Sequence, residues 1–181
     1  MNKKVSILVF STRPKGNCAH ISEFVSNYHT NDQVQTYVID SGDFAPCGGC
    51  NYECLTPGVT CPRRTEGQMK LMDALCKSDL VYYIVPNYCG YPSANYFAFN
   101  ERCVGYFNLD RALMAAYMSV PKAFIVVSNT EGFEAAMRQQ TKEELRILYL
   151  KSGKYQKRST AGDILESAEA LKDLQNFLDQ L

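Results

Sequence analysis

Five short apolar runs are spread along the chain, and they are rich in the β-branched and aromatic side chains that favour strands. They predict strands over residues 4–10, 34–39, 79–86, 120–128 and 145–150, and the third strand is expected to end at Pro86. Between these runs apolar positions recur at helical spacing. This spacing predicts helices over 18–28, 67–78, 93–117 (one broken helix or two), 131–142 and 163–181.

Regular alternation of strand and helix is typical of βαβ units, and strands that are apolar on both faces need helices on both sides. The predicted fold class is therefore α/β, with a doubly wound, five-stranded parallel sheet. The 181 residues are close to the usual size of one domain, and we expect residues 1–181 to form a single domain. Ligands bind beyond the carboxyl ends of such strands, which directs attention to residues 11–18, 41–64, 87–92 and 128–132.

Charge and hydropathy exclude several classes of protein. Lys and Arg number 19 and Asp and Glu number 19, so the net charge is zero, whereas a nucleic-acid-binding protein normally carries a basic excess or patch. No apolar run approaches the ~18 residues of a membrane span, and the apolar segment near the N-terminus is too short for a signal peptide. We expect a cytoplasmic protein without nucleic-acid or membrane partners. Its eight cysteines are then more typical of metal binding or reactivity than of disulfides.

The segment after the first predicted strand, residues 11–18, combines hydroxyl groups, the cation of Arg13 and the start of a helix. Backbone amides at a helix N-terminus together with a nearby cation favour an anion, so phosphate binding is one interpretation. The other is a polar turn in which Asn17 caps the helix and Arg13 points into solvent. Neither the dinucleotide fingerprint nor the Walker motif is present.

Two motifs carry a resemblance to a known family. Ser11-Thr12-Arg13, followed by Gly16-Asn17-Cys18, resembles the G-S-x-R-x-x-x-N-[ST] phosphate loop of the NADPH-dependent FMN reductase family, which has a flavodoxin-like fold. Pro86-Asn87-Tyr88-Cys89-Gly90-Tyr91-Pro92-Ser93 is similar to the P-x-Y-x-x-x-x-S flavin loop of that family. Glu101-Arg102 and Gly162-Asp163-Ile164 also agree with it. Phe10 stands where the family has Gly, and Cys18 stands where a Ser or Thr hydroxyl normally touches the phosphate.

The resemblance implies a bound FMN and a flavodoxin-like fold. The phosphate would be held by Ser11, Arg13, Asn17 and the amide of Cys18. The ring would lie against Pro86, Asn87, Tyr88, Cys89 and Gly90, and its pyrimidine end would be closed by Ser128, Asn129, Thr130 and Gly132. The resemblance also implies NAD(P)H as a transient co-substrate, a small-molecule electron acceptor, and a homodimer or higher homo-oligomer with residues 96–117 as the contact surface.

Four cysteines lie in one irregular stretch, with the spacing C-x2-C-x3-C-x6-C, and they are Cys47, Cys50, Cys54 and Cys61. Four thiolates could hold a [4Fe–4S] cluster or a zinc ion. Iron–sulfur flavoproteins, relatives of the reductase family, carry a cluster motif near C-x2-C-x2-C-x5-C at this place, so two spacings here are one residue longer. Free or redox-active thiols on a loop that shapes the flavin pocket are the third alternative.

The leading hypothesis is an FMN-dependent oxidoreductase, in which NAD(P)H reduces the flavin and the flavin passes electrons to a quinone, a flavin or another small acceptor. Because the flavin carries this chemistry, no catalytic acid or base is required of the protein. One alternative is an iron–sulfur flavoprotein that acts as an electron carrier with a [4Fe–4S] cluster on the cysteine loop. Another is a flavin-free binding module of the same fold.

Overall fold

The computed structural model describes residues 2–40, 42, 44–108 and 110–181, so Ser41, which begins the segment 41–64, lies outside the described residues. The strands are β1 (Lys4–Val9), β2 (Gln33–Val38), β3 (Leu80–Tyr88), β4 (Tyr91–Pro92), β5 (Lys122–Ser128) and β6 (Arg146–Lys151). The α-helices are α1 (Asn17–Tyr28), α2 (Glu66–Cys76), α3 (Ala94–Phe107), α4 (Arg111–Ser119), α5 (Glu134–Arg138) and α6 (Ala168–Leu178). Two short 3-10 helices are η1 (Glu53–Leu55) and η2 (Ile164–Glu166).

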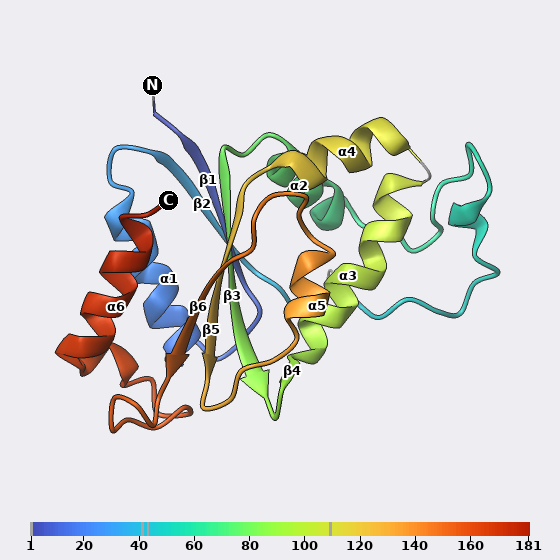
Figure 1. The fold of residues 1–181 in the computed structure, drawn as a ribbon. Helices are drawn as coiled ribbons and strands as arrows, with labels where there is room; N and C mark the ends of the chain where they lie inside the picture. The colour runs from blue at the N-terminus through green and yellow to red at the C-terminus, as the bar shows by residue number, and fades with distance from the viewer. Residues whose placement is uncertain (1, 41, 43, 109) are drawn as a thin grey trace.

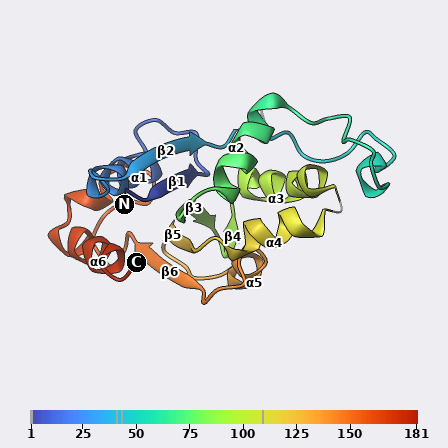
Figure 2. The same ribbon diagram turned by 90° about the horizontal axis from the view of Figure 1, so that it is seen from above.

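The sheet confirms the predicted fold class. Its parallel strands follow the order β2-β1-β3-β5-β6, and β4 adds a short antiparallel hairpin to β3. This order, in which the chain crosses from β1 over to β3 and continues outward, is the flavodoxin-like one. Helices α1 and α6 cover one face of the sheet and α2 to α5 cover the other (Figures 1 and 2). The loop that carries the four cysteines projects beyond α2 and α3 (Figure 2).

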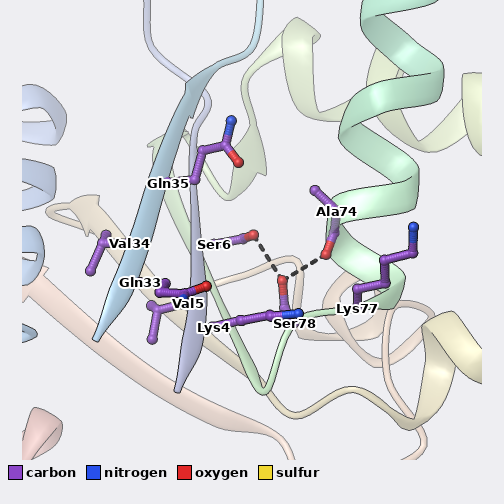
Figure 3. A pocket seen from close by; sticks show the side chains of 9 residues that line it. All are labelled: Lys4, Val5, Ser6, Gln33, Val34, Gln35, Ala74, Lys77 and Ser78. Carbon is purple, nitrogen blue, oxygen red and sulfur yellow. Dashed lines mark hydrogen bonds between the residues drawn. The ribbon is translucent and has the colours of Figure 1, made fainter. Parts of the chain in front are cut away.

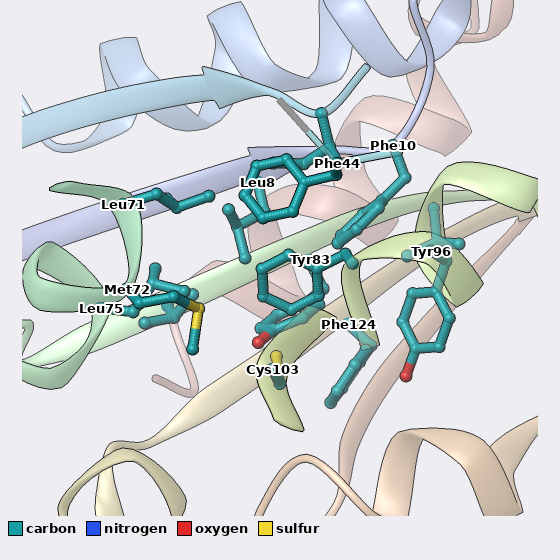
Figure 4. Packing of buried hydrophobic residues seen from close by; sticks show 14 of the residues in the cluster. Leu8, Phe10, Phe44, Leu71, Met72, Leu75, Tyr83, Tyr96, Cys103 and Phe124 are labelled. Carbon is teal, nitrogen blue, oxygen red and sulfur yellow. The ribbon is translucent and has the colours of Figure 1, made fainter. Parts of the chain in front are cut away.

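Alternating side chains of the central strands divide the core into two layers. In β1, Ile7 and Val9 enter the core under α1 and α6, whereas Leu8 enters the core on the other face. Phe10, just past the strand end, joins Leu8 and packs its ring 5.6 Å from that of Tyr83 (Figure 4). Both faces of the central strands are thus buried, which explains their continuous apolar runs.

Strand β3 continues through Pro86 to Tyr88, so the prediction that it ends at the proline is wrong. The carbonyl of Ile84 accepts a hydrogen bond from Phe10 N at 3.0 Å, which shows that the peptide group of Ile84 faces β1. The backbone nitrogen of Pro86, two residues later, faces the same side of the strand as the peptide group of Ile84. At that level β1 has already ended, so no strand lies there to accept a hydrogen bond. The missing N–H of the proline therefore removes no hydrogen bond of the sheet.

Several helices differ from the predicted ranges. The predicted helix over 131–142 shrinks to α5, since Gly132 and Phe133 have φ values of +147° and +51° that no helix accommodates. The range 93–117 forms two helices, α3 and α4, as one of the two expectations stated, and Asn108 at the end of α3 has a φ of +43°. In the described part of the chain no helix is both long and apolar enough to cross a membrane.

Candidate functional site

A cavity of about 130 Å³ opens where β1, β3 and β5 reach their carboxyl ends, which is the edge where this fold binds ligands. We call it the sheet-end cavity. It is lined by Ser11, Arg13, Gly16, Asn17, Cys18, Pro86, Asn87, Tyr88, Val127, Ser159 and Thr160. The two motifs that are far apart in the sequence, residues 11–18 and 86–88, thus face one space. Seven of the thirteen residues predicted to bind the cofactor line it.

The N-terminus of α1 forms one wall of this cavity. Gly16 is the N-cap and supplies no side-chain cap, so the alternative in which Asn17 caps the helix is not what the structure shows. The first N–H groups of a helix lack partners within the helix and carry a partial positive charge. Arg13 is exposed, and among the described residues its guanidinium has no ion pair and no hydrogen bond. Helix amides and an unpaired cation together favour an anion here.

Asn17 has a structural role that its motif did not reveal. Its Nδ2 donates to the carbonyl oxygens of Arg158 at 3.2 Å and Ser159 at 3.0 Å, and its Oδ1 accepts from the amide of Ile164 at 3.0 Å. The side chain therefore fastens the loop after β6 to the start of α1. Since its side-chain donors and acceptor are used within the protein, the backbone N–H of Asn17 is the group that remains for a ligand.

Gly162 completes this junction between the loop and α1. Its φ is +80°, and a Cβ atom at this position would overlap the carbonyl oxygen of Lys15. The carbonyl of Gly162 also lies 2.7 Å from Nδ1 of His20. A side chain at position 162 would push the loop away from the helix start, so this close approach requires glycine.

The two departures from the family pattern are accommodated in different ways. Phe10 does not line the cavity, because its side chain is buried in the core, and its carbonyl accepts a hydrogen bond from Oγ of Ser93 at 2.9 Å. Cys18 does line the cavity, with its side chain almost fully buried. Burial raises the pKa of the Cys18 thiol to about 12, although the nearby charge of Arg13 lowers it in part. A thiol with this pKa is neutral at pH 7 and does not repel an anion.

A tight hairpin between β3 and β4 forms the rim on the other side. Its two turn residues, Cys89 and Gly90, have φ values of +53° and +89°, as a two-residue hairpin turn requires. The flanking rings of Tyr88 and Tyr91 are 53% and 67% exposed. Tyr88 lines the cavity directly, so its exposed ring is available to a ligand at the rim.

Residues 128–132 and 89–90 support the rim without lining the cavity. Asn87 Nδ2 donates to the carbonyl of Thr130 at 2.8 Å, and Asn87 Oδ1 accepts from the amide of Gly90 at 2.9 Å. A Cβ atom on Gly132 would lie 2.7 Å from the carbonyl oxygen of Gly90, so the two loops are in direct contact. The polar side chains of Ser128, Asn129 and Thr130 bond to each other or to the loop after β6.

Four lining residues are not among those predicted to bind the cofactor, and they are Gly16, Val127, Ser159 and Thr160. Ser159 and Thr160 belong to the loop after β6, the last parallel strand. This loop follows the carboxyl end of the fifth parallel strand, so the rule that ligands bind beyond the carboxyl ends of strands applies to it as well. Nothing in the sequence marks Val127 as different from its buried neighbours.

The four cysteines of the loop lie near one another without forming a metal site. Cys54 and Cys61 are buried, whereas Cys47 and Cys50 are half-buried. Burial, followed by the nearby thiols of the other three, raises the pKa of Cys54. No group of three or more His, Cys, Asp or Glu side chains within the described ranges is placed to hold a metal ion. The geometry therefore does not fit a [4Fe–4S] cluster or a zinc ion.

Another hollow of about 320 Å³ lies at the opposite edge of the sheet, between β1, β2 and the end of α2 (Figure 3). Its serine hydroxyls already have partners, because Ser6 Oγ and Ser78 Oγ lie 2.8 Å apart and Ser78 donates to the carbonyl of Ala74 at 2.9 Å. It lies at the amino ends of the strands, where ligands of this fold class are not expected.

Comparison with solved structures finds the same architecture in several proteins. Smu.1420 from Streptococcus mutans UA159 superposes with a TM-score of 0.67 at 13% identity, covering 97% of this chain and 98% of that one. The flavoenzyme NAD(P)H:(acceptor) oxidoreductase FerB from Paracoccus denitrificans gives 0.54 at 15% identity, covering 98% and 96%. The NADH:FMN oxidoreductase EMOB, in its apo form, gives 0.52 at 11% identity, covering 99% and 90%. The likeness establishes the fold.

No protein-family model and no curated protein matches the sequence. At identities of 11 to 15% the structural neighbours share this fold over nearly their whole length. What this chain binds and which reaction it carries out must therefore be argued from its own residues.

Proposed function

We propose that the protein is an FMN-dependent oxidoreductase that takes reducing equivalents from NAD(P)H and delivers them to a small acceptor such as a quinone or another flavin. The observation that carries this proposal is the convergence of two features on the sheet-end cavity. One is the anion-binding wall of α1 with the unpaired Arg13, and the other is the exposed ring of Tyr88. Two neighbours of the same fold, FerB and EMOB, bear the names of flavin-dependent oxidoreductases, which supports the proposal.

The size of the cavity suits one end of the cofactor. At about 130 Å³ it is smaller than the ~300–1,000 Å³ of pockets that enclose a whole drug-sized ligand. We assign it to the phosphate and the adjoining chain of FMN, held by Arg13, the hydroxyl of Ser11 and the amides of Asn17 and Cys18. The ring would lie outside the cavity, over the hairpin of β3 and β4.

The protein groups at this site bind and orient. When bound, FMN supplies the capacity to accept hydride from a reduced nicotinamide and to pass electrons on. The described residues that line the cavity include no Asp, Glu or His, so neither a carboxylate nor an imidazole is available there for proton transfer. Tyr88 offers an aromatic surface for the ring, and the contact between Gly132 and Gly90 keeps its edge of the rim in place. A flavin carries out the redox chemistry itself, so the protein needs only to bind and orient it.

The test compares FMN with riboflavin, which lacks the phosphate, in the wild type and in Arg13→Ala. We expect the variant to lose about tenfold or more in affinity for FMN and little for riboflavin, because one charge-assisted contact to the phosphate is removed. Quenching of flavin fluorescence on titration measures both constants. Arg146→Ala is the matched control, because it removes an exposed arginine from the first position of β6, at the amino end of that strand, whereas the cavity lies at the carboxyl ends of the strands.

Equal losses for the two flavins in Arg13→Ala would contradict the assignment of the phosphate to α1. A protein that binds neither flavin would favour the flavin-free binding module. An absorption spectrum and an iron assay on protein purified without oxygen separate the oxidoreductase from the electron carrier, because the carrier requires iron.

We also propose that residues 1–181 form one FMN-binding domain and that two or more copies join through α3 and α4. Most aromatic rings between residues 96 and 117 are buried in the core, so they are not available for such contacts. Among the described residues there, the large apolar side chains that reach the surface are Phe97, Val104 and Met114, which are 44 to 48% exposed. We also propose a cytoplasmic location, in which the eight cysteines, all free in the structure, would stay reduced.

A further inference from the structure

A separate cavity of about 210 Å³ lies between the cysteine loop and α3, and it shares no lining residue with the sheet-end cavity. We call it the arginine cavity. It is lined by Gly42, Ala45, Arg63, Thr65 and Arg102. Among the described side chains that line it, two are cations and none is an acid.

Arg102 is the residue that requires explanation, because it is only 2% exposed. Its Nη2 donates to Gln68 Oε1 at 3.2 Å and to the carbonyl oxygen of Arg63, and its Nη1 donates to Cys61 Sγ at 3.6 Å. These bonds use three of the five N–H groups of the guanidinium, and none of the acceptors is a carboxylate. A buried charge is costly unless an opposite charge is close to it.

No carboxylate within the described ranges forms an ion pair with Arg102 or Arg63. Two described acids that neighbour these arginines in the sequence, Glu101 and Glu66, are engaged elsewhere. Glu101 accepts a hydrogen bond from the amide of Cys47 at 3.0 Å, and Glu66 pairs with Lys70 at 2.6 Å. Two positive charges therefore border one small space without a negative charge from the described part of the protein.

The other lining groups add hydrogen-bond donors. Arg63 is exposed, and its Nη1 donates to the carbonyl of Gly48 at 2.5 Å, which keeps the guanidinium beside the cysteine loop. Thr65 is the N-cap of α2 and accepts from the amide of Gln68 at 3.1 Å, while its hydroxyl is itself a donor. The cavity thus combines a buried guanidinium, an exposed guanidinium and a hydroxyl.

We propose that the arginine cavity binds a tetrahedral oxyanion, either inorganic phosphate or the phosphate group of a small monoester. Guanidinium groups match such oxyanions because their N–H groups can contact two oxygens at once. The cavity is below the ~300 Å³ at which pockets begin to enclose drug-sized ligands, so it suits a single phosphate group. The bound anion would supply the negative charge that Arg102 lacks, and it would join the cysteine loop to α3 through Arg63.

The test uses the full chain with inorganic phosphate as the probe, in a buffer whose ionic strength is held constant with chloride. Arg13→Gln is introduced first, to weaken the contribution of the sheet-end cavity. In this background we expect saturable binding by calorimetry and a thermal midpoint that rises with phosphate concentration. Adding Arg63→Gln should weaken binding by about tenfold or more, because it removes a charge-assisted contact. Arg146→Gln, added in the same way, should leave it unchanged.

Arg102→Lys tests the buried position, since it keeps the charge and removes the planar group, and it should also weaken binding. Should that variant fail to fold, Arg63→Gln still decides, because Arg63 is exposed. The absence of saturable binding in the Arg13→Gln background, or equal affinity with and without Arg63, would overturn the proposal. Glycerol 2-phosphate in place of phosphate distinguishes the two sources. Tighter binding of the ester supports a monoester ligand, and tighter binding of phosphate supports the free ion.

Discussion

Cys18 and Cys89 lie beside the same site and differ in exposure, one of the properties that govern thiol reactivity. Cys89 is exposed in the hairpin turn, whereas Cys18 is buried in the first turn of α1. Burial raises the pKa of Cys18 to about 12, and it has the same effect on Cys103 in α3. Eight cysteines in one chain therefore do not amount to eight reactive thiols.

We predict that one equivalent of iodoacetamide at pH 8 modifies Cys89 well before Cys18 or Cys103. A thiol of pKa 12 is about one part in ten thousand thiolate at pH 8, and only the thiolate reacts. Mass spectrometry of the digested protein measures the rates. The same reaction in urea is the control, since unfolding should bring the rates together. Equal rates in the folded protein would contradict the burial of Cys18.

The sequence predicts the place of Asn17 but not the direction of its side chain. The motif places Asn17 at the site, and the residue does line the sheet-end cavity. The direction of its side chain depends on carbonyl groups 141 and 142 positions later in the chain and on an amide 147 positions later. No local pattern contains that information, because it arises only when β6 has taken its place in the sheet.

Among the elements, the loops that surround the sheet-end cavity are held by close backbone contacts. Gly132 meets Gly90, and Gly162 meets Lys15, each at a φ that L side chains rarely adopt. These contacts position the rim and the anion-binding wall without any side chain from the glycines. Loops that are already rigid reduce the entropic cost of binding, because they do not have to become ordered when a cofactor binds.

The contact at Gly162 gives a prediction with an internal control. Gly162→Ala should lower the free energy of unfolding by about 3 kcal/mol or more, because its Cβ would overlap the carbonyl of Lys15 in addition to the unfavourable φ. Gly58 has nearly the same φ, +78°, and a Cβ there meets nothing within 4 Å. Gly58→Ala should therefore cost only about 1 kcal/mol. Urea unfolding measures both, and equal effects would show that the overlap is relieved.

Helices and strands could be predicted from the sequence where their burial requires a regular pattern of apolar residues. The central strands are buried on both faces, so their apolar runs identified them and gave the correct fold class. The helix over 131–142 was overestimated, because the left-handed backbone of Phe133 has no signal in residue type. The continuation of β3 through Pro86 depends on where its neighbour β1 ends, which a rule about proline alone does not include.

At the scale of the whole molecule, a buried cation lies at the amino end of a central strand of the sheet. Lys122, the first residue of β5, is 1% exposed. Its Nζ donates to the carbonyl oxygens of Tyr117 at 2.5 Å and Val120 at 3.0 Å, and it lies 4.3 Å from the centre of the Tyr117 ring. Burial nevertheless lowers the pKa of Lys122 to about 8.

This pKa predicts how stability depends on pH. Between about pH 8 and the unfolded pKa of about 10.4, the unfolded chain holds a proton on Lys122 that the folded protein has released, so this group makes folding more favourable as the pH rises. From pH 7 to pH 9.5 the wild type should gain about 2 kcal/mol relative to Lys122→Met. Chemical unfolding of both proteins at the two pH values measures the difference between their free energies of unfolding. The tyrosines and cysteines are present in both proteins, so their own titration largely cancels from this difference. A difference that is the same at pH 7 and pH 9.5 would contradict the lowered pKa of Lys122.

The junction between α1 and the loop after β6 has a consequence for the order of events during synthesis. Residues 11–18 leave the ribosome before the groups that fix them, because the first of those groups, at position 158, follows Asn17 by 141 positions. Contacts of such long sequence separation form late in folding. Until then the start of α1 lacks its covering loop, so a nascent chain offers an incomplete cradle for an anion. Loading with a cofactor then belongs to the period after β6 and the loop that follows it have taken their places beside α1.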